Sequence, residues 1–340
     1  MAVTIKQVAE RAQVSTTTVS YVLNGTGTVT EATRQRVLDA VSALGYQPHH
    51  AARSMRGRSE TIGLVLPAWG DRLADPATAE ILAGLAGAAA KQGYHLLLAT
   101  AESAADEPRL CMSLIQTGRV DGVVLLDPLV EDPRAEALRA ADMAHVCAGP
   151  VEGSPWVALD GHAGARLATE HLLGLGHTRI GLIQIPSELA ESEPRYQGYA
   201  EALGHAEVVF DPELVVEAGR REEDGYQAVL ALLELPEPPT AILACSDDLA
   251  IGALHALHEA GLSVGNDISL VGFDDLPQAA HTQPPLTTLR QARRALGEQL
   301  AERLHAAIVG RSSQPNRTLV PRLVVRRSSG PPRLRDASEQ

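Results

Sequence analysis

The pattern of apolar and polar positions changes near residue 60. Before that point, apolar residues recur every three or four positions within short polar segments, which is the spacing of amphipathic helices. After it, short continuous apolar runs alternate with longer amphipathic stretches. The pattern therefore predicts a small all-α head followed by a larger α/β body.

The apolar runs of the body have the length and composition of buried parallel strands. We expect strands at 62–66, 94–99, 120–126, 144–148, 179–185, 206–210, 240–245 and 267–273. We expect helices between most of them, at 77–92, 161–175, 193–204, 225–235 and 248–261. This alternation predicts doubly wound parallel sheets, and the length of the body favours two of them with a ligand cleft between.

The head has the spacing of three short helices, which we expect at residues 5–12, 16–23 and 30–44. Thr4 and Gln7 fit a capping box at the start of the first helix. Two short helices joined by a tight turn and braced by a third are the minimum of a helix-turn-helix. A three-helix bundle that binds protein has the same pattern, so the spacing alone leaves both readings open.

Charge separates the head from the body. The 340 residues carry 29 Lys and Arg against 42 Asp and Glu, a net charge of −13, which as an average argues against binding to nucleic acid. Residues 1–60, however, carry seven basic and four acidic residues, a net charge of +3, and the other 280 residues carry −16. The chain is therefore a basic head on an acidic body.

Several motifs occur in a fixed order along almost the whole chain. The second predicted helix reads VSTTTVSYVLN, and the body contains GRVDGVVLL, HLLGLGHTRIGLI and SDDLAIGALHALHEAGLSVGNDISLVGFDD. Over about residues 3–332 the chain resembles the lactose-repressor family (LacI/GalR type). The resemblance implies a dimeric transcription regulator, most often a repressor, whose periplasmic-binding-protein-like core senses a small molecule.

The resemblance also implies which residues of the head contact double-stranded operator DNA. Base-reading positions of the family fall on Thr16, Thr17 and Tyr21. Contacts to phosphates or bases are expected from Thr4, Ser15, Thr18, Ser20 and Asn24. Tyr21 stands where the family usually has Arg or His, and a phenol cannot form the bidentate Arg–guanine pair. Gln13 replaces the usual Gly of the turn, at a cost of ~1 kcal/mol if its φ is positive.

Residues 49–60 resemble the hinge helix of the family, which folds on specific DNA and inserts an apolar side chain into the minor groove. Met55 is the expected wedge, where Leu is usual, and Arg53 and Arg56 are expected to attract phosphate. The alternative is a plain linker.

We divide the chain as follows: a DNA-binding head at 1–48, a hinge at 49–60, an effector-binding and dimerisation core at 61–330, and a flexible tail at 331–340. Within the core we expect one lobe from 61–160 and 291–320 and another from 161–290 and 321–330. Residues 290–310 predict an amphipathic helix, and no leucine heptad follows residue 330. A homodimer is therefore expected rather than a tetramer.

Polar residues just beyond the predicted strands are candidates for the effector site, because parallel strands present their carboxyl ends to a common cleft. They are Trp69, Asp75, Asp127, Glu191, Arg195, Arg220, Asp247 and Asp274. Arg195, in an R-x-x-G motif, and Asp274 match effector contacts of the family, and Asp247 matches the Asp of its Asn-Asp pair. Arg220 stands where an aromatic residue is common. Strand-end capping or a surface ion pair is the alternative role for each.

Carboxylates and Arg suit a polyhydroxylated ligand, so a sugar or sugar derivative is the first expectation for the effector. A nucleobase, a nucleoside or a cationic metabolite is the alternative. Because the ligand would contact both lobes, its binding is expected to change their angle and thereby the affinity for the operator.

The sequence contains none of the phosphate-loop, nucleophile-elbow or zinc-protease motifs, so we expect no catalytic residue, no cofactor and no metal site. It also lacks a secretory apolar segment and any run of the ~18 apolar residues that a membrane helix needs. Three widely spaced cysteines fit free thiols in a reducing compartment. We therefore expect a cytoplasmic protein without membrane contact. A solute-binding protein that serves a transporter is the alternative with the same two lobes. Such a protein would need a signal peptide, and it would have no use for a basic head.

Overall fold

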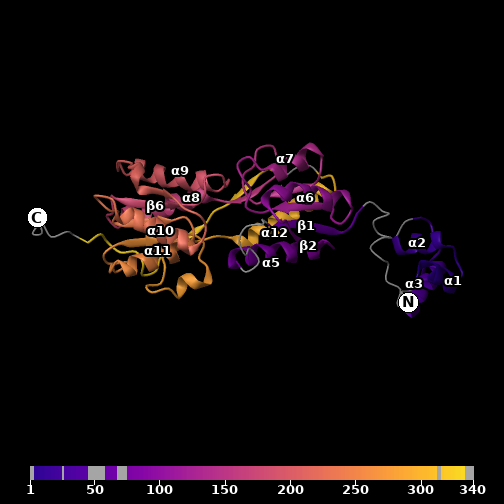
Figure 1. Cartoon of the computed structure of the whole chain (residues 1–340). Helices are drawn as coiled ribbons and strands as arrows, with labels where there is room; N and C mark the ends of the chain where they lie inside the picture. Colours follow the sequence, from indigo (N-terminus) through magenta and orange to yellow (C-terminus); the bar gives the residue numbers. More distant parts are fainter. Residues whose placement is uncertain (1–3, 25–26, 45–57, 67–74, 312–314, 334–340) are drawn as a thin grey trace, which may run out of the picture. The chain divides into compact units, whose positions relative to one another are not determined.

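The computed structural model describes residues 4–24, 27–44, 58–66, 75–311 and 315–333 (Figure 1). Its contacts divide the chain into two compact units, Met1–Ser59 and Glu60–Gln340. Four of the predicted site residues, Arg53, Met55, Arg56 and Trp69, lie outside the described residues. No described helix is long and apolar enough to cross a membrane.

The head folds into the three predicted helices, each within one residue of its expected bounds. They are α1 (Ile5–Ala12), α2 (Thr16–Asn24) and α3 (Glu31–Leu44). Their small core is formed by Val8, Ala9, Ala12, Val19, Val22, Val37 and Ala40. At the start of α1, Gln7 Oε1 accepts hydrogen bonds from the backbone N–H of Thr4 at 2.8 Å and from its hydroxyl at 3.1 Å. The predicted capping contact is thus formed, and local sequence sets where the helix begins.

The turn between α1 and α2 contains Gln13 in the left-handed conformation that the family's glycine would adopt at this position. Gln13 ends α1 with φ 54° and ψ 48°, and the N–H of Val14 bonds to Ala9 O at 3.0 Å. Ser15 then caps α2, because its Oγ accepts from the N–H of Thr18 at 3.0 Å. Packing therefore preserves the tight turn although no glycine is present.

The first lobe of the body is built on a four-stranded parallel sheet in the order β2-β1-β3-β4. Its strands are β1 (Thr61–Leu66), β2 (His95–Thr100), β3 (Gly122–Leu125) and β4 (His145–Cys147). Alternate side chains of β1 face opposite sides. Leu64 packs with the helices α5 (Pro76–Lys91) and α12 (Arg293–Ile308), and Val65 packs with α6 (Glu107–Gln116) and α7 (Pro133–Ala140). Helices therefore cover both faces, as a doubly wound sheet requires. We call this unit the N-lobe.

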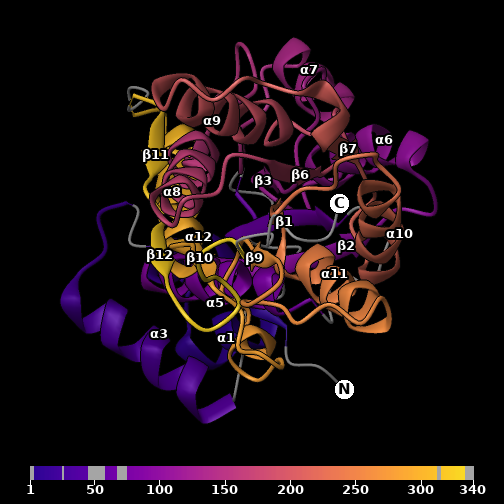
Figure 2. The same cartoon turned by 90° about the vertical axis from the view of Figure 1, so that its left-hand side faces the viewer.

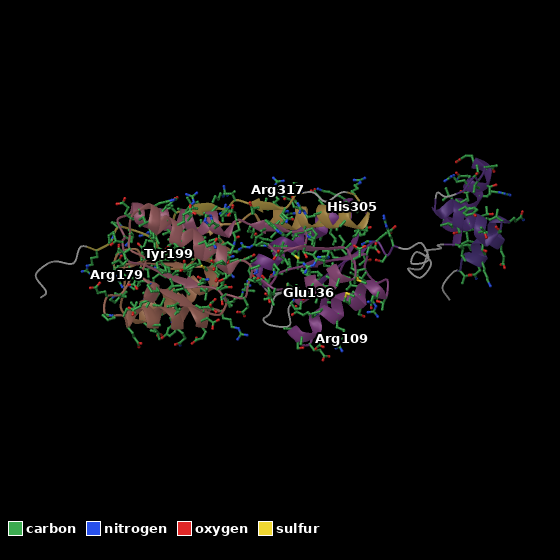
Figure 3. The ribbon with its side chains drawn as sticks, turned by 90° about the horizontal axis from the view of Figure 1, so that it is seen from above. Arg109, Glu136, Arg179, Tyr199, His305 and Arg317 are labelled. Atoms are coloured by element: carbon green, nitrogen blue, oxygen red, sulfur yellow. The ribbon has the colours of Figure 1, made fainter. Side chains whose placement is uncertain are left out.

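The second lobe repeats this plan with the parallel sheet order β7-β6-β8-β9, and we call it the C-lobe. Its strands are β6 (Ile180–Gln184), β7 (Val215–Glu217), β8 (Ala241–Ala244) and β9 (Ser269–Val271). Its helices are α8 (Gly161–Gly174), α9 (Ser192–His205), α10 (Glu222–Leu233) and α11 (Asp247–Glu259). The pair α8 and α9 lies on one side of β6, and the pair α10 and α11 on the other (Figure 2). Buried Tyr199, labelled in Figure 3, donates its hydroxyl to Ile180 O at 2.7 Å within this lobe.

Short strands that the sequence did not predict lie where the chain passes between the lobes. They are β5 (Val157–Leu159), β10 (Thr288–Arg290), β11 (Arg317–Leu319) and β12 (Arg322–Val324). The first pairs in parallel with β11, and β10 pairs antiparallel with β12. Three single-turn 3₁₀ helices, η1 (Ala104–Asp106), η2 (Pro212–Leu214) and η3 (Pro277–Ala280), complete the described elements. The C-terminal part of the chain therefore returns to both lobes, and α12 belongs to the N-lobe.

One predicted strand is wrong. Residues 206–210 follow the end of α9 as an irregular segment, with Glu207 at φ 57° and Val209 88% exposed. The neighbour of β6 is β7, a few residues later. The apolar residues at 206–210 predicted a strand. Instead, the ring of Phe210 packs edge to face against the ring of Tyr196, with the ring centroids 6.0 Å apart. The sequence also missed α6 and α7. All three cysteines are free and buried, as expected.

Candidate effector cavity and DNA-binding surface

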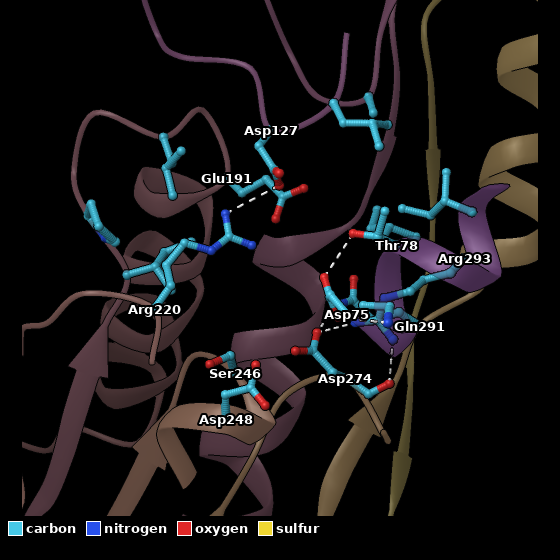
Figure 4. A pocket seen from close by; sticks show the side chains of 18 of the residues that line it. Asp75, Thr78, Asp127, Glu191, Arg220, Ser246, Asp248, Asp274, Gln291 and Arg293 are labelled. Carbon is cyan, nitrogen blue, oxygen red and sulfur yellow. Dashed lines mark hydrogen bonds and ion pairs between the residues drawn. The ribbon is translucent and has the colours of Figure 1, made fainter. Parts of the chain in front are cut away.

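A cavity of about 670 Å³ lies between the two lobes of the body. Residues of the N-lobe line one side, residues of the C-lobe line the other, and the segment leading into α12 closes it (Figure 4). Six of the predicted site residues line this cavity, namely Asp75, Asp127, Glu191, Arg195, Arg220 and Asp274. They gather because both parallel sheets direct their strand ends and helix starts toward the same space.

Arg195 is held rigidly at the wall of the cavity. It is 5% exposed, and its guanidinium lies 4.5 Å from the centre of the Phe273 ring. Its Nη1 donates to Cys245 O at 2.5 Å, and its Nη2 donates to Glu191 Oε2 at 2.6 Å, one helical turn earlier. The Nε of Arg195 is buried and has no hydrogen-bond partner among the described residues. Buried donors usually have a partner, so this atom is available to a ligand acceptor.

Asp274 connects the end of β9 to the start of α12. Its Oδ1 accepts from Gln291 Nε2 at 2.6 Å and from Arg293 Nη2, and its carbonyl accepts from Arg293 Nη1 at 2.8 Å. The backbone of Asp274 has φ 145°, which is uncommon for a residue with a side chain. The carboxylate is therefore positioned by two residues of the N-lobe side, neither of which was singled out in the sequence.

An ion pair crosses the cavity from lobe to lobe. Arg220 Nη1 of the C-lobe donates to Asp127 Oδ1 of the N-lobe at 3.2 Å. Burial lowers the pKa of Arg220, but the carboxylates of Asp127, Glu191 and Asp274 hold it above its ordinary value. Arg220 therefore occupies the position expected for an aromatic side chain and instead binds the opposite lobe.

A short backbone contact lies beside this ion pair. The N–H of Val130 bonds to Glu188 O at 2.9 Å, and the N–H of Ala190 bonds to Pro128 O at 2.9 Å. Leu129 and Leu189 thus form an isolated antiparallel bridge between the two lobes. Together with the ion pair, this contact holds the lobes against each other at one edge of the cavity.

Asp247 does not line the cavity, which corrects the expectation that it contacts the effector. Its side chain is fully buried; Oδ1 accepts from the Thr288 hydroxyl at 2.5 Å, and Oδ2 accepts from the N–H of Leu276 at 2.7 Å. Burial, and then the neighbouring Asp274, raise the pKa of this carboxyl. Asp247 therefore anchors the loop after β9 to β10. The next residue, Asp248, faces the cavity and was missed.

Asp75 lines the cavity and also caps a helix. One of its oxygens accepts from the N–H of Ala77 at 2.9 Å, and the other accepts from the Thr78 hydroxyl at 2.8 Å. Other lining residues that were not candidates are Thr78, Glu188, Asp224, Ser246, Asp248, Gln291 and Arg293. The described lining contains no aromatic side chain. Most of these residues lie at the start of a helix or just after a short strand. Polar residues at the starts of predicted helices are therefore the sequence signal that could have identified them.

The second helix of the head presents a polar outer surface. Thr16, Thr17 and Tyr21 are exposed, and Tyr21 is 45% exposed. Ser15 and Thr18 bond to each other through their side chains at 2.9 Å, and Ser20 is half-buried. The side chain of Asn24 lies outside the described part of the head, and Thr4 is exposed at the start of α1. The hydroxyl groups of Thr16, Thr17 and Tyr21 therefore lie at the surface of α2.

Comparisons with known proteins agree with this arrangement. Residues 4–49 match the model described as bacterial regulatory proteins, lacI family, and residues 169–329 match the model described as periplasmic binding protein-like domain. The HTH-type transcriptional regulator AglR of Rhizobium meliloti (strain 1021) is 38% identical over 340 aligned positions, which span 97% of this chain and 95% of that protein.

Two solved structures are similar over almost the whole chain. The complex of the transcriptional regulator CelR with cellobiose is 34% identical, has a TM-score of 0.75, and matches 96% of this chain and 100% of that one. The lac repressor dimer bound to operator and the anti-inducer ONPF is 29% identical, has a TM-score of 0.84, and matches 97% and 100%. With a helix-turn-helix head and a two-lobed periplasmic-binding-protein-like body, the chain belongs to the lacI family of bacterial regulatory proteins and is a DNA-binding transcriptional regulator.

Proposed function

We propose that this regulator is a repressor that binds a palindromic operator as a homodimer. A sugar or sugar derivative that binds between the lobes changes its affinity for the operator, either lowering or raising it. The observation that carries the proposal is the cavity itself, where the buried Arg195 and the half-buried Asp274 of the C-lobe face residues of the N-lobe. A ligand that contacts both walls favours one angle between the lobes.

The sugar assignment is supported by the chemistry of the lining and by one solved relative. Carboxylates and guanidinium groups at fixed positions suit the paired hydroxyls of a sugar. The structure of CelR that resembles this chain is described as a complex with cellobiose. A nucleobase would be expected to stack on an aromatic ring, and the described lining offers none.

Operator binding is assigned to the head on charge and surface chemistry. The net charge of +3 falls on residues 1–60, and the exposed Thr16, Thr17 and Tyr21 lie on one helix. One short helix gives modest affinity, so two copies in a dimer are needed to read two half-sites. The acidic body should repel phosphate and confine contact to the head and hinge.

Selection of bound DNA from a random library is the direct test. The full chain should enrich a palindrome, and a chain that lacks residues 1–60 should enrich nothing. Thermal shift of the full chain against sugars, nucleosides and polyamines then tests the effector, since a ligand that binds only the folded state raises Tm. Stabilisation by nucleosides and by no sugar would overturn the sugar assignment and leave the regulator assignment intact.

The hinge wedge has a test of its own. Met55→Ala should weaken binding to the selected operator about tenfold or more, equivalent to ~1.4 kcal/mol, because it removes the side chain proposed to unstack the central step. Gel shift at fixed salt measures this change. Unchanged affinity would show that residues 49–60 act only as a linker.

A further inference from the structure

The cavity is rich in hydrogen-bond acceptors, and most of its cationic groups already bind protein carboxylates. Seven carboxylates and four guanidinium groups line its described part. Three of the four guanidinium groups bind protein carboxylates: Arg195 binds Glu191, Arg220 binds Asp127, and Arg293 binds Asp274. The fourth, Arg221, is exposed. A ligand phosphate or carboxylate would therefore approach an excess of negative charge, and at three of the four guanidinium groups it would compete with a protein carboxylate.

Asp248 is a carboxylate of this site that has no partner among the described residues. It lies in the first turn of α11, lines the cavity and is half-buried (Figure 4). Within the described part of the chain, no side chain or backbone group donates a hydrogen bond to its carboxylate, and no basic group pairs with it. Asp274, Asp75 and Glu222 are its acidic neighbours, and Arg220 is its basic one. An ionised carboxylate can only accept hydrogen bonds, so a ligand must supply the donor.

A second and independent acceptor points to the same requirement. Gln291 is 6% exposed and lines the cavity, and its amide nitrogen is committed to Asp274 at 2.6 Å. Its Oε1 is buried, and the described part of the chain offers it no hydrogen-bond partner. A buried acceptor left unpaired is unfavourable, because it has lost its hydrogen bonds to water. A ligand donor that reaches it would remove this cost.

We propose that the cavity selects an effector that carries no negative charge and donates hydrogen bonds to Asp248 and Gln291, and that Asp248 determines this specificity. The inference rests on the proposed function and names the chemical class of its ligand. The donors are hydroxyl groups of a neutral sugar or the ammonium group of an amino sugar. A hydroxyl group also accepts, which suits the unpartnered Arg195 Nε as well. Sugar phosphates and uronic acids are excluded.

The test is a matched panel titrated into the full chain by calorimetry: cellobiose, glucose, glucosamine, glucose 6-phosphate and glucuronate. The neutral sugars or glucosamine should bind at least tenfold more tightly than the two anionic sugars. Tighter binding of an anionic sugar would overturn this inference while the proposed sugar-responsive function stands. Binding of no member would contradict both, because the proposed effector class itself would be absent.

Asp248→Asn separates the role of the charge from the shape of the site. The variant should lose about tenfold in affinity for glucosamine, and less for a neutral sugar, and it should gain affinity for glucose 6-phosphate. Glu259→Gln is the matched control, because it removes one charge from the exposed far end of the same helix. Equal effects of the two substitutions on every ligand would show that Asp248 does not determine specificity. A Tm of Asp248→Asn without ligand that is no lower than that of the original chain would exclude a folding defect.

Discussion

Two adjacent carboxylates at the start of α11 show how strongly one position along a helix changes a side chain's environment. Asp247 is enclosed and binds the N–H of Leu276 and the hydroxyl of Thr288, whereas Asp248 faces the cavity and receives no hydrogen bond from any described residue. Burial, and then Asp274, raise the pKa of Asp248 to about 6. Asp247 therefore stabilises the fold, whereas the carboxylate of Asp248 can accept a hydrogen bond from a ligand.

Asp248→Asn should stabilise the body at neutral pH. The folded state binds the proton of Asp248 more tightly than the unfolded state, so this group's unfavourable contribution grows as pH rises from about 4 to about 6. The variant should exceed the original chain by about 1–2 kcal/mol in free energy of unfolding at pH 7, after allowance for solvent screening. The difference should vanish near pH 4. Urea denaturation across this range measures it, and a difference independent of pH would contradict the assigned cause.

Gln13 makes a second prediction for a single residue. Its φ of 54° is a conformation that glycine adopts without penalty. Gln13→Gly should therefore stabilise the head by about 0.5–1 kcal/mol, the cost of the left-handed region less the entropy of glycine in the unfolded chain. Hydrogen exchange of the amides of α1 to α3 in the full chain should slow several-fold. Glu10→Gly, in the regular part of α1, is the control and should speed exchange.

At the scale of elements, close approach of helices decides the packing of each lobe. The helices α5 and α12 cross through Gly84 and Gly297. A Cβ at Gly84 would lie 2.0 Å from Arg294 O, and one at Gly297 would lie 2.1 Å from Ile81 O. Neither carbonyl can move without disturbing its own helix. The two glycines thus fix the position of α12, which carries Arg293 and closes the cavity.

Gly84→Ala should destabilise the body by about 1–3 kcal/mol, because the new methyl group would push α12 away from α5. Gly87→Ala, one turn later on α5, is the matched control, since no atom lies within 4 Å of a Cβ there. That control should gain about 0.5–1 kcal/mol from the better helix propensity of alanine. Thermal denaturation of both variants checks the pair. Equal changes of the same sign would show that helix propensity, and not the crossing, governs this site.

At the scale of the whole molecule, the relation between the lobes is the variable that a regulator of this family can use. The ion pair between Arg220 and Asp127 and the backbone contact of residues 128–130 with 188–190 join the lobes at one edge. These contacts lie beside the cavity. A ligand bound there is therefore close enough to break the contacts between the lobes or to strengthen them. We therefore expect Arg220 to influence the angle between the lobes.

Arg220→Ala should shift the lobes toward a more open arrangement, because the ion pair of Asp127 with the opposite lobe would be lost, at a cost of about 1–3 kcal/mol. Small-angle scattering of the full chain should detect a larger radius of gyration. Asp127→Asn should act in the same direction, and the double variant should change it little further, since the two residues share one interaction. Additive effects would show that Arg220 and Asp127 act separately. An unchanged radius in all three variants would show that the backbone contact alone holds the lobes.

The sequence by itself determined the elements whose causes are local. The helices of the head end within one residue of prediction because capping and apolar spacing act over three or four residues, as at Thr4 and Ser15. Most buried strands followed from apolar runs, and the rule for strand ends placed six candidate residues at the cavity. Family membership followed from motifs in order, and the comparisons confirmed it.

Only the tertiary structure decided which residues meet across the chain. The strand expected at 206–210 gave way to β7, because pairing with β6 depends on the sheet and not on local apolarity. Asp248, and not Asp247, faces the cavity because the loop after β9 encloses the first of the two. Gln291 reaches the cavity through the returning segment, far along the chain. Strand pairing, burial and charge contacts are non-local, so their outcome depends on the complete fold.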